Sequence, residues 1–154
     1  MTFGAYFGFK DLAMRSRALL AALLAAAPAV AHAQATPAPA PRDTSTTWGR
    51  QYTTWFYTGQ VDSIWAQMNA QMREALGGKP DRLKTFADQA PEQVGKEMKV
   101  IRERVLVQGD YVVYLREVLM EKFADTMLVQ WARDKDDRIA GFFIQPKKAV
   151  MDGQ

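Results

Sequence analysis

The sequence predicts an α+β fold, in which N-terminal helices pack on a curved four-stranded antiparallel sheet. Before about residue 95 the apolar residues recur every three or four positions, as they do on the buried face of a helix. After Gly95 the period falls towards two and β-branched or aromatic residues dominate, as they do in strands. Helices first and consecutive strands afterwards are typical of the α+β class.

The first predicted helix carries an aromatic stripe. Threonine and serine hydroxyls at 44–47 are available to cap its start, and Gly59 offers a C-terminal stop. At helical spacing, the stripe consists of Trp48, Tyr52, Trp55 and Phe56.

Between Val61 and Leu76 the apolar spacing fits one bent helix or two short ones. Asn69 is able to cap a second piece, and Gly77-Gly78 would end it. The spacing does not decide between these alternatives.

A further helix is predicted between two prolines. Pro80 stands where the first helical turn tolerates proline, and Pro91 is expected to close the segment. Its apolar face consists of Leu83, Phe86 and Ala87.

Four strands are predicted in the second half of the chain. They cover Val100 to Gln108, Tyr111 to Glu121, Met127 to Arg133 and Arg138 to Gln145. Gly109-Asp110 and Asp136-Asp137 are natural centres of tight turns, and residues 122–126 suit a longer turn. Successive strands should therefore pair antiparallel as a meander.

The strand that starts at Tyr111 is largely apolar on both faces, so both faces are expected to be covered. Helices on one side and a partner subunit on the other would satisfy the pattern, as would a cavity and a cover. In the last strand Gly141 suggests a bend, a bulge or a close backbone approach.

Residues 1–33 are predicted to be a secretory signal peptide. Arg15 and Arg17 precede an apolar run from Ala18 to Ala31, and cleavage is expected after Ala33. The run is short for a membrane span and contains Pro28, which disfavours a membrane anchor. Met14 is an alternative to Met1 as the start.

The expected location is periplasmic or secreted. Residues 34–46 alternate alanine with proline and lack large apolar residues, which is typical of a solvated linker. Residues 47–154 then form a single domain, large enough for an ordinary core.

Composition argues against several function classes. The only histidine lies within the predicted signal, at position 32, and the chain has no cysteine. Its net charge is +3, and residues 1–33 hold three of the 20 basic and one of the 17 acidic residues, which leaves +1 after cleavage. Without a dense basic cluster nucleic-acid binding is disfavoured, and no cofactor is expected.

The hairpin from Trp131 to Pro146 resembles the closing hairpin of a small exported bacterial domain of unknown function. The resemblance covers nearly all of residues 47–147, and it departs at Asp137, where the family usually has glycine. That domain often precedes α/β-hydrolase or serine hydrolase modules, and it is similar to the cone-shaped, nuclear-transport-factor-2-like superfamily. The resemblance implies a conical pocket between helices and sheet, and no particular activity.

A non-catalytic role is favoured. The mature sequence lacks the nucleophile motifs of both hydrolase classes, so their activity does not carry over. The alternative is an isomerase or lyase of the ketosteroid-isomerase type, which would use a carboxylate base and a tyrosine. Its candidate residues are Asp62, Glu103, Glu117, Tyr57, Tyr111 and Tyr114.

The expected function is protein association or the binding of a small apolar or anionic ligand, alongside a separately encoded envelope hydrolase. A homodimer through the sheet is expected. Arg116 is the first choice for an anion site, although pairing with a glutamate on a neighbouring strand is the usual outcome. No metal site is predicted, because the acidic turn at 134–137 lacks the spacing of a calcium loop. The candidate ligand-binding residues are Trp55, Trp65, Tyr114, Arg116 and Trp131.

Overall fold

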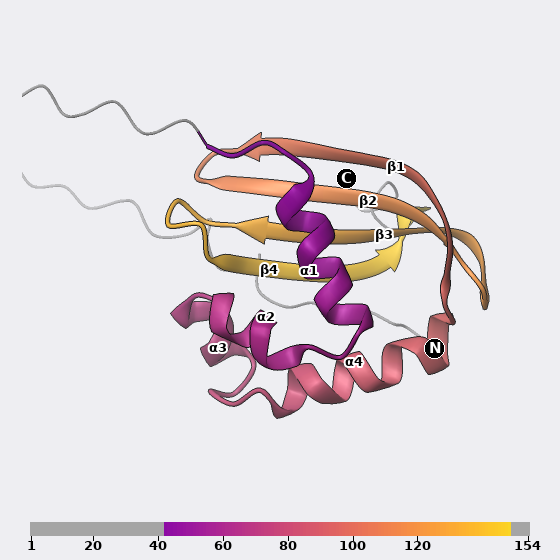
Figure 1. Ribbon diagram of the computed structural model, residues 1–154, viewed down its shortest axis with the longest axis horizontal. Helices are drawn as coiled ribbons and strands as arrows, with labels where there is room; N and C mark the ends of the chain where they lie inside the picture. The colour runs from indigo at the N-terminus through magenta and orange to yellow at the C-terminus, as the bar shows by residue number, and fades with distance from the viewer. Residues whose placement is uncertain (1–41, 149–154) are drawn as a thin grey trace, which may run out of the picture.

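A computed structural model describes residues 42–148 and shows the α+β fold that the sequence predicts (Figure 1). The helices are α1 (Thr47–Tyr57), α2 (Val61–Gln67), α3 (Ala70–Ala75) and α4 (Asp81–Val94). The strands are β1 (Glu97–Gln108), β2 (Tyr111–Met120), β3 (Phe123–Arg133) and β4 (Ile139–Pro146). They form one antiparallel meander in the order β1-β2-β3-β4, which confirms the predicted topology. The predicted signal peptide and most of the predicted linker lie outside the described residues.

Asn69 divides the second helical segment into two short helices. Its side chain caps α3 by accepting a hydrogen bond from the backbone N–H of Met72 at 2.8 Å. At the other end of α3, Gly77 and Gly78 take positive φ and donate their N–H groups to carbonyls of the last turn. The structure therefore selects two helices from the two alternatives.

Two predicted helix boundaries are wrong. The threonine hydroxyls do not cap α1, since its N-cap Thr46 makes no side-chain hydrogen bond to the helix. Pro91 does not close α4, which runs on to Val94. The proline forfeits one donor, but its carbonyl still accepts from the N–H of Gly95, and Val94 packs against the core.

The predicted long turn at Lys122 to Thr126 is also wrong. Met120 pairs with Phe123, so only two residues connect β2 to β3. Phe123 is partly buried against the core, and this burial favours a strand that begins at Phe123 instead of a longer turn.

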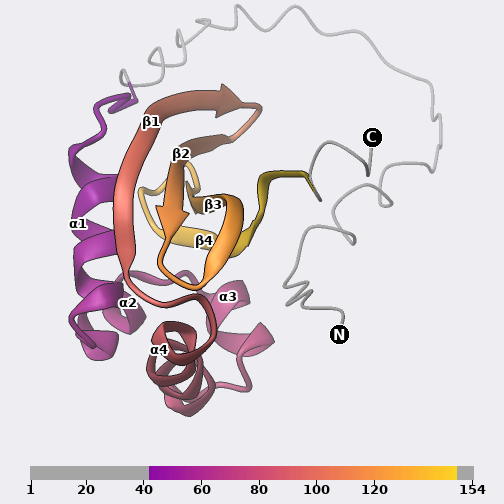
Figure 2. The ribbon, with the colours of Figure 1, turned by 90° about the vertical axis from the view of Figure 1, so that its right-hand side faces the viewer.

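The helices cover one face of the sheet. Figure 2 shows α1 lying against the curved sheet, with α2, α3 and α4 grouped below it. The core between these layers holds four large side chains that are wholly buried: Ile64, Tyr114, Trp131 and Ile139. No helix among residues 42–148 is long and apolar enough to cross a membrane.

Both faces of β2 are buried, as its two-sided apolar pattern predicts. Alternate residues join the core under the helices, and the intervening Val113 and Leu115 form a second cluster with Leu128 and Ala132 of β3. The large apolar side chains that remain exposed therefore lie elsewhere, chiefly on β1.

The last hairpin contains the irregularity that Gly141 suggests. Gly141 pairs with Ala132 and Ile139 with Arg133, so Ala140 is an extra residue in β4 and forms a bulge. In the preceding turn Asp137 takes a left-handed φ of 58°, the conformation for which glycine is the usual choice.

Candidate functional site

An ion-pair network joins the first two strands on the helix-facing side of the sheet. Arg116 lies at its centre, between two glutamates of β1. Its guanidinium donates to both carboxylate oxygens of Glu97, at 2.6 and 3.1 Å, and to Glu103 Oε1 at 2.5 Å. The sequence predicts either an anionic ligand or a glutamate on a neighbouring strand as the partner of Arg116. In the structure Arg116 pairs with two glutamates of the neighbouring strand. The two-point contact with Glu97 is the strongest geometry for a guanidinium and a carboxylate.

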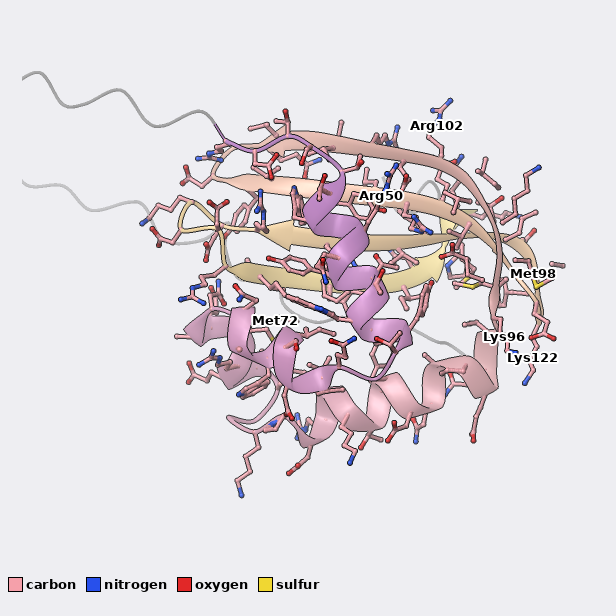
Figure 3. All side chains as sticks on the ribbon, in the orientation of Figure 1. Arg50, Met72, Lys96, Met98, Arg102 and Lys122 are labelled. Atoms are coloured by element: carbon pink, nitrogen blue, oxygen red, sulfur yellow. The ribbon has the colours of Figure 1, made fainter. Side chains whose placement is uncertain are left out.

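Two tyrosines and a second arginine complete this Arg116 network. Tyr114 donates its hydroxyl to Glu103 Oε1. From α1, Arg50 donates to Glu103 Oε2 at 2.5 and 2.9 Å, and Tyr57 donates to Glu97 Oε2 at 3.1 Å. Figure 3 shows Arg50 reaching from α1 towards the strands. Each carboxylate oxygen of the two glutamates therefore accepts at least one hydrogen bond from the protein itself.

The network is shielded from solvent except on the α1 side. The side chains of Arg116, Glu97 and Glu103 are 16, 14 and 13% exposed. Arg50 is 60% exposed and closes the network from outside. Removing one member of such a poorly solvated ion-pair network leaves an uncompensated buried charge and destabilises the fold.

The electrostatics hold Glu103 ionised. Burial alone would raise the pKa of Glu103, but hydrogen bonds from Arg50, Tyr114 and Arg116 outweigh burial and lower its pKa to about 2. Burial and the same carboxylate raise the pKa of Tyr114 to about 12. Neither group exchanges a proton near neutral pH.

The electrostatics of Glu103 do not match those that an isomerase centred on this residue would need. A general base works best with a pKa near the working pH, and a carboxylic acid that donates to an oxyanion needs a raised pKa. Glu103 lies beside a tyrosine hydroxyl as that alternative requires, but its pKa is shifted the opposite way. Glu117, another candidate, bonds to Lys147 at 2.9 Å, and this bond lowers its pKa too.

We expect the replacement Glu103→Gln to remove a pH-dependent part of the stability. The folded pKa lies below the free value of 4.5, so the stabilisation is complete above about pH 5 and is lost as pH falls from 4.5 towards 2. The variant should therefore be about 2 kcal/mol less stable than the native chain near neutral pH, a figure that allows for partial solvent screening. Urea unfolding at several pH values between about 2.5 and 7 measures the difference.

The matched control for this prediction is Glu92→Gln, an exposed glutamate of α4. Its effect should be small and nearly independent of pH. A stability gap for Glu103→Gln that stays equal at both ends of the pH range would contradict the ion-pair account.

The structure brings some of the predicted ligand-binding residues together. Tyr114 and Arg116 are hydrogen-bonded in the network. The rings of Trp55 and Trp131 both contact the ring of Tyr52, each with a centroid distance of 5.6 Å. Trp131 is wholly buried and belongs to the hydrophobic core under the helices. Trp65 makes no ring contact with the other predicted residues in the described part of the chain. The guanidinium carbon of Arg73 lies 5.7 Å from the centroid of the Trp65 ring.

Two hollows lie on the helical side of the molecule. An apolar pocket of about 110 Å³ opens between α3, α4 and β4. A polar groove of about 380 Å³ lies where α2 and α4 begin, and Asp62, Asp81 and Lys84 are among the residues that line it. Within residues 42–148 no group of three or more metal-ligating side chains is placed to hold an ion.

Sequence reasoning missed three residues that matter here. It began β1 at Val100, so Glu97 fell outside the predicted sheet. Arg50 stood on the polar side of a helix, where a charged side chain is ordinary. Arg82, which lines the apolar pocket, had the same appearance. An arginine two residues after Pro80 at a predicted helix start was the one available signal, because a cation there opposes the helix dipole.

Comparison of the chain with protein-family models, with curated proteins and with solved structures finds no match. Membership of the nuclear-transport-factor-2-like superfamily therefore stays a prediction.

Proposed function

We propose that the chain is an exported, non-catalytic association domain of the cone-shaped, nuclear-transport-factor-2-like type, and that it forms a homodimer through the free edge of β1. The observation that carries the proposal is where apolar surface is exposed. Of the six exposed large hydrophobic side chains in the described part of the chain, five lie on β1: Met98, Val100, Ile101, Leu106 and Val107.

β1 is an edge strand of 12 residues with one hydrogen-bonded neighbour, β2. An edge that is long and apolar presents unpaired backbone groups to another chain, and proteins usually protect such edges with charges or bulges. Here bulges at Met98 and Ile101 interrupt only the first half of the strand. The second half, from Arg102 to Gln108, keeps regular pairing and offers the better template.

An antiparallel pair of β1 strands is self-complementary around Leu106. A twofold axis at this residue places Leu106 opposite its own copy and Val105 opposite Val107, so apolar side chains meet. The same register places Arg104 opposite Gln108 of the second copy, so two polar side chains that can form a hydrogen bond meet at the end of the strand. Isologous pairing of this kind closes the assembly as a dimer.

We expect Leu106→Lys to weaken the dimer at least about tenfold, because like charges then face each other across the axis. Analytical ultracentrifugation of the full chain up to high micromolar concentration measures the dissociation constant. The matched control is Met98→Lys, at an exposed position of the bulged half of β1, which should leave the dimer unchanged.

A mixing experiment tests the register itself. Leu106→Lys and Leu106→Glu should each be monomeric, and the two variants mixed should form a heterodimer, since opposite charges then meet. A native chain that stays monomeric, or variants that dimerise as the native chain does, would contradict the proposal. In the first case a separately encoded envelope hydrolase becomes the favoured occupant of the edge.

A further inference from the structure

We infer that the pocket between α3, α4 and β4 binds a short-chain carboxylate, with the acyl chain inside the pocket and the carboxylate on Arg82. This site shares no residue with β1 and does not depend on the proposed dimer. It also differs from the predicted ligand-binding residues, none of which lines it.

The walls of the pocket are apolar on every side but one. Met72 comes from α3, Leu76 directly follows that helix, Leu83 and Phe86 come from α4, and Phe143 comes from β4. Figure 3 shows Met72 between the short helices and the sheet. A concave apolar site with a single charged group at its border is the usual form of a small-ligand site, because the walls supply affinity and the charge fixes orientation.

Arg82 is the only charged residue that lines this pocket. Its side chain is exposed, and within residues 42–148 its guanidinium has neither a hydrogen-bond partner nor an ion-pair partner. The other arginines with a structural role, such as Arg116 and Arg133, are held by carboxylates. A free guanidinium beside an apolar pocket matches a ligand with a carboxylate at one end, which it binds through two parallel hydrogen bonds.

The surroundings of Arg82 favour an anion further. It lies in the first turn of α4, a helix of 14 residues, where the unpaired N–H groups add positive potential. Gly77 lies beside it: a Cβ there would be 3.9 Å from Arg82 Cζ and Nε. The guanidinium therefore rests against the α3–α4 connection, close to the pocket.

The volume limits the length of the ligand. At about 110 Å³ the pocket is smaller than the cavity of roughly 150 Å³ that holds benzene in an engineered protein. It suits a chain of about four to six carbons and excludes a steroid or a long fatty acid. The chemical class is therefore a short-chain monocarboxylate, or the exposed acyl end of a larger molecule.

The test is a titration of the full chain with the straight-chain carboxylates from butanoate to octanoate, by calorimetry or ligand-observed NMR. We expect affinity to rise about fourfold for each added methylene and to level off once the pocket is full, near six carbons. Hexan-1-ol should bind about tenfold more weakly than hexanoate, since it lacks the charge. Absence of hexanoate binding at about 10 mM, or affinity that ignores chain length, would overturn the proposal.

Two variants separate the charge from the pocket. Arg82→Gln should bring hexanoate down to the affinity of hexan-1-ol while the dependence on chain length remains. The control is Lys84→Gln, an exposed cation of the same helix that lines the polar groove instead, and it should keep the preference for hexanoate. Equal loss in both variants would show a general charge effect and would also overturn the assignment. The dimer experiments report on another surface, so either proposal can fail alone.

Discussion

Replacing Trp131 with alanine is expected to lower the free energy of unfolding by about 4 kcal/mol. The indole is wholly buried and stacks on Phe142 with a ring-centroid distance of 3.8 Å. It also packs edge-on against Tyr52, so its removal leaves a cavity between α1 and the sheet that no flexible side chain can fill. Urea unfolding followed by circular dichroism measures the loss.

A second variant divides this loss between packing and hydrogen bonding. Trp131 Nε1 donates to Thr53 Oγ1 at 3.1 Å, and the Thr53 hydroxyl itself donates to the carbonyl of Gly49. Trp131→Phe keeps most of the ring volume and leaves Thr53 partnered, so it should cost only about 1 to 2 kcal/mol. Near-native stability of Trp131→Ala would contradict a core role and return this tryptophan to the ligand interpretation.

The spacing of apolar residues predicted the fold class, the strand order and most ends of helices and strands, because it reflects which side chains are buried. The β-branched and aromatic residues of β2 and β4, and the turn residues beside them, located these two strands to within one residue at each end. Tertiary packing overruled local signals in two places: Val94 continues α4 beyond Pro91, and Phe123 starts β3 inside a predicted turn. In both, burying one apolar side chain outweighed a local preference.

The candidate site was less accessible from sequence. Glu97 and Glu103 are an even number of residues apart, so a regular strand would place them on one face, but bulges at Met98 and Ile101 interrupt the pattern and the predicted strand began only at Val100. A cross-strand register is fixed only when the strands pair, and residue spacing along one strand does not encode it. The pocket beside Arg82 combines the consecutive helices α3 and α4 with β4, which is far from them in the sequence, and no linear motif marks such a place.

Gly49→Ala is expected to destabilise the fold by about 3 kcal/mol, although alanine is the better helix former by about 1 kcal/mol. Gly49 lies in α1 where the helix crosses the ring of Tyr114, and an added Cβ would overlap that ring. The ring is wholly buried and its hydroxyl is bound to Glu103, so it has no free space to enter. The helix must move away, which also disturbs the contacts of Arg50 and Trp48.

The control is Gly141→Ala, where a Cβ would meet its nearest neighbours at 3.5 and 3.6 Å, an ordinary contact distance. This variant should change stability by less than about 1 kcal/mol. A double-mutant cycle makes the test specific: with Tyr114→Leu in place, the added methyl group has room, and Gly49→Ala should cost at least about 1 kcal/mol less than it does alone. Additive losses would mean that the close approach of α1 to Tyr114 is not what requires glycine at this position.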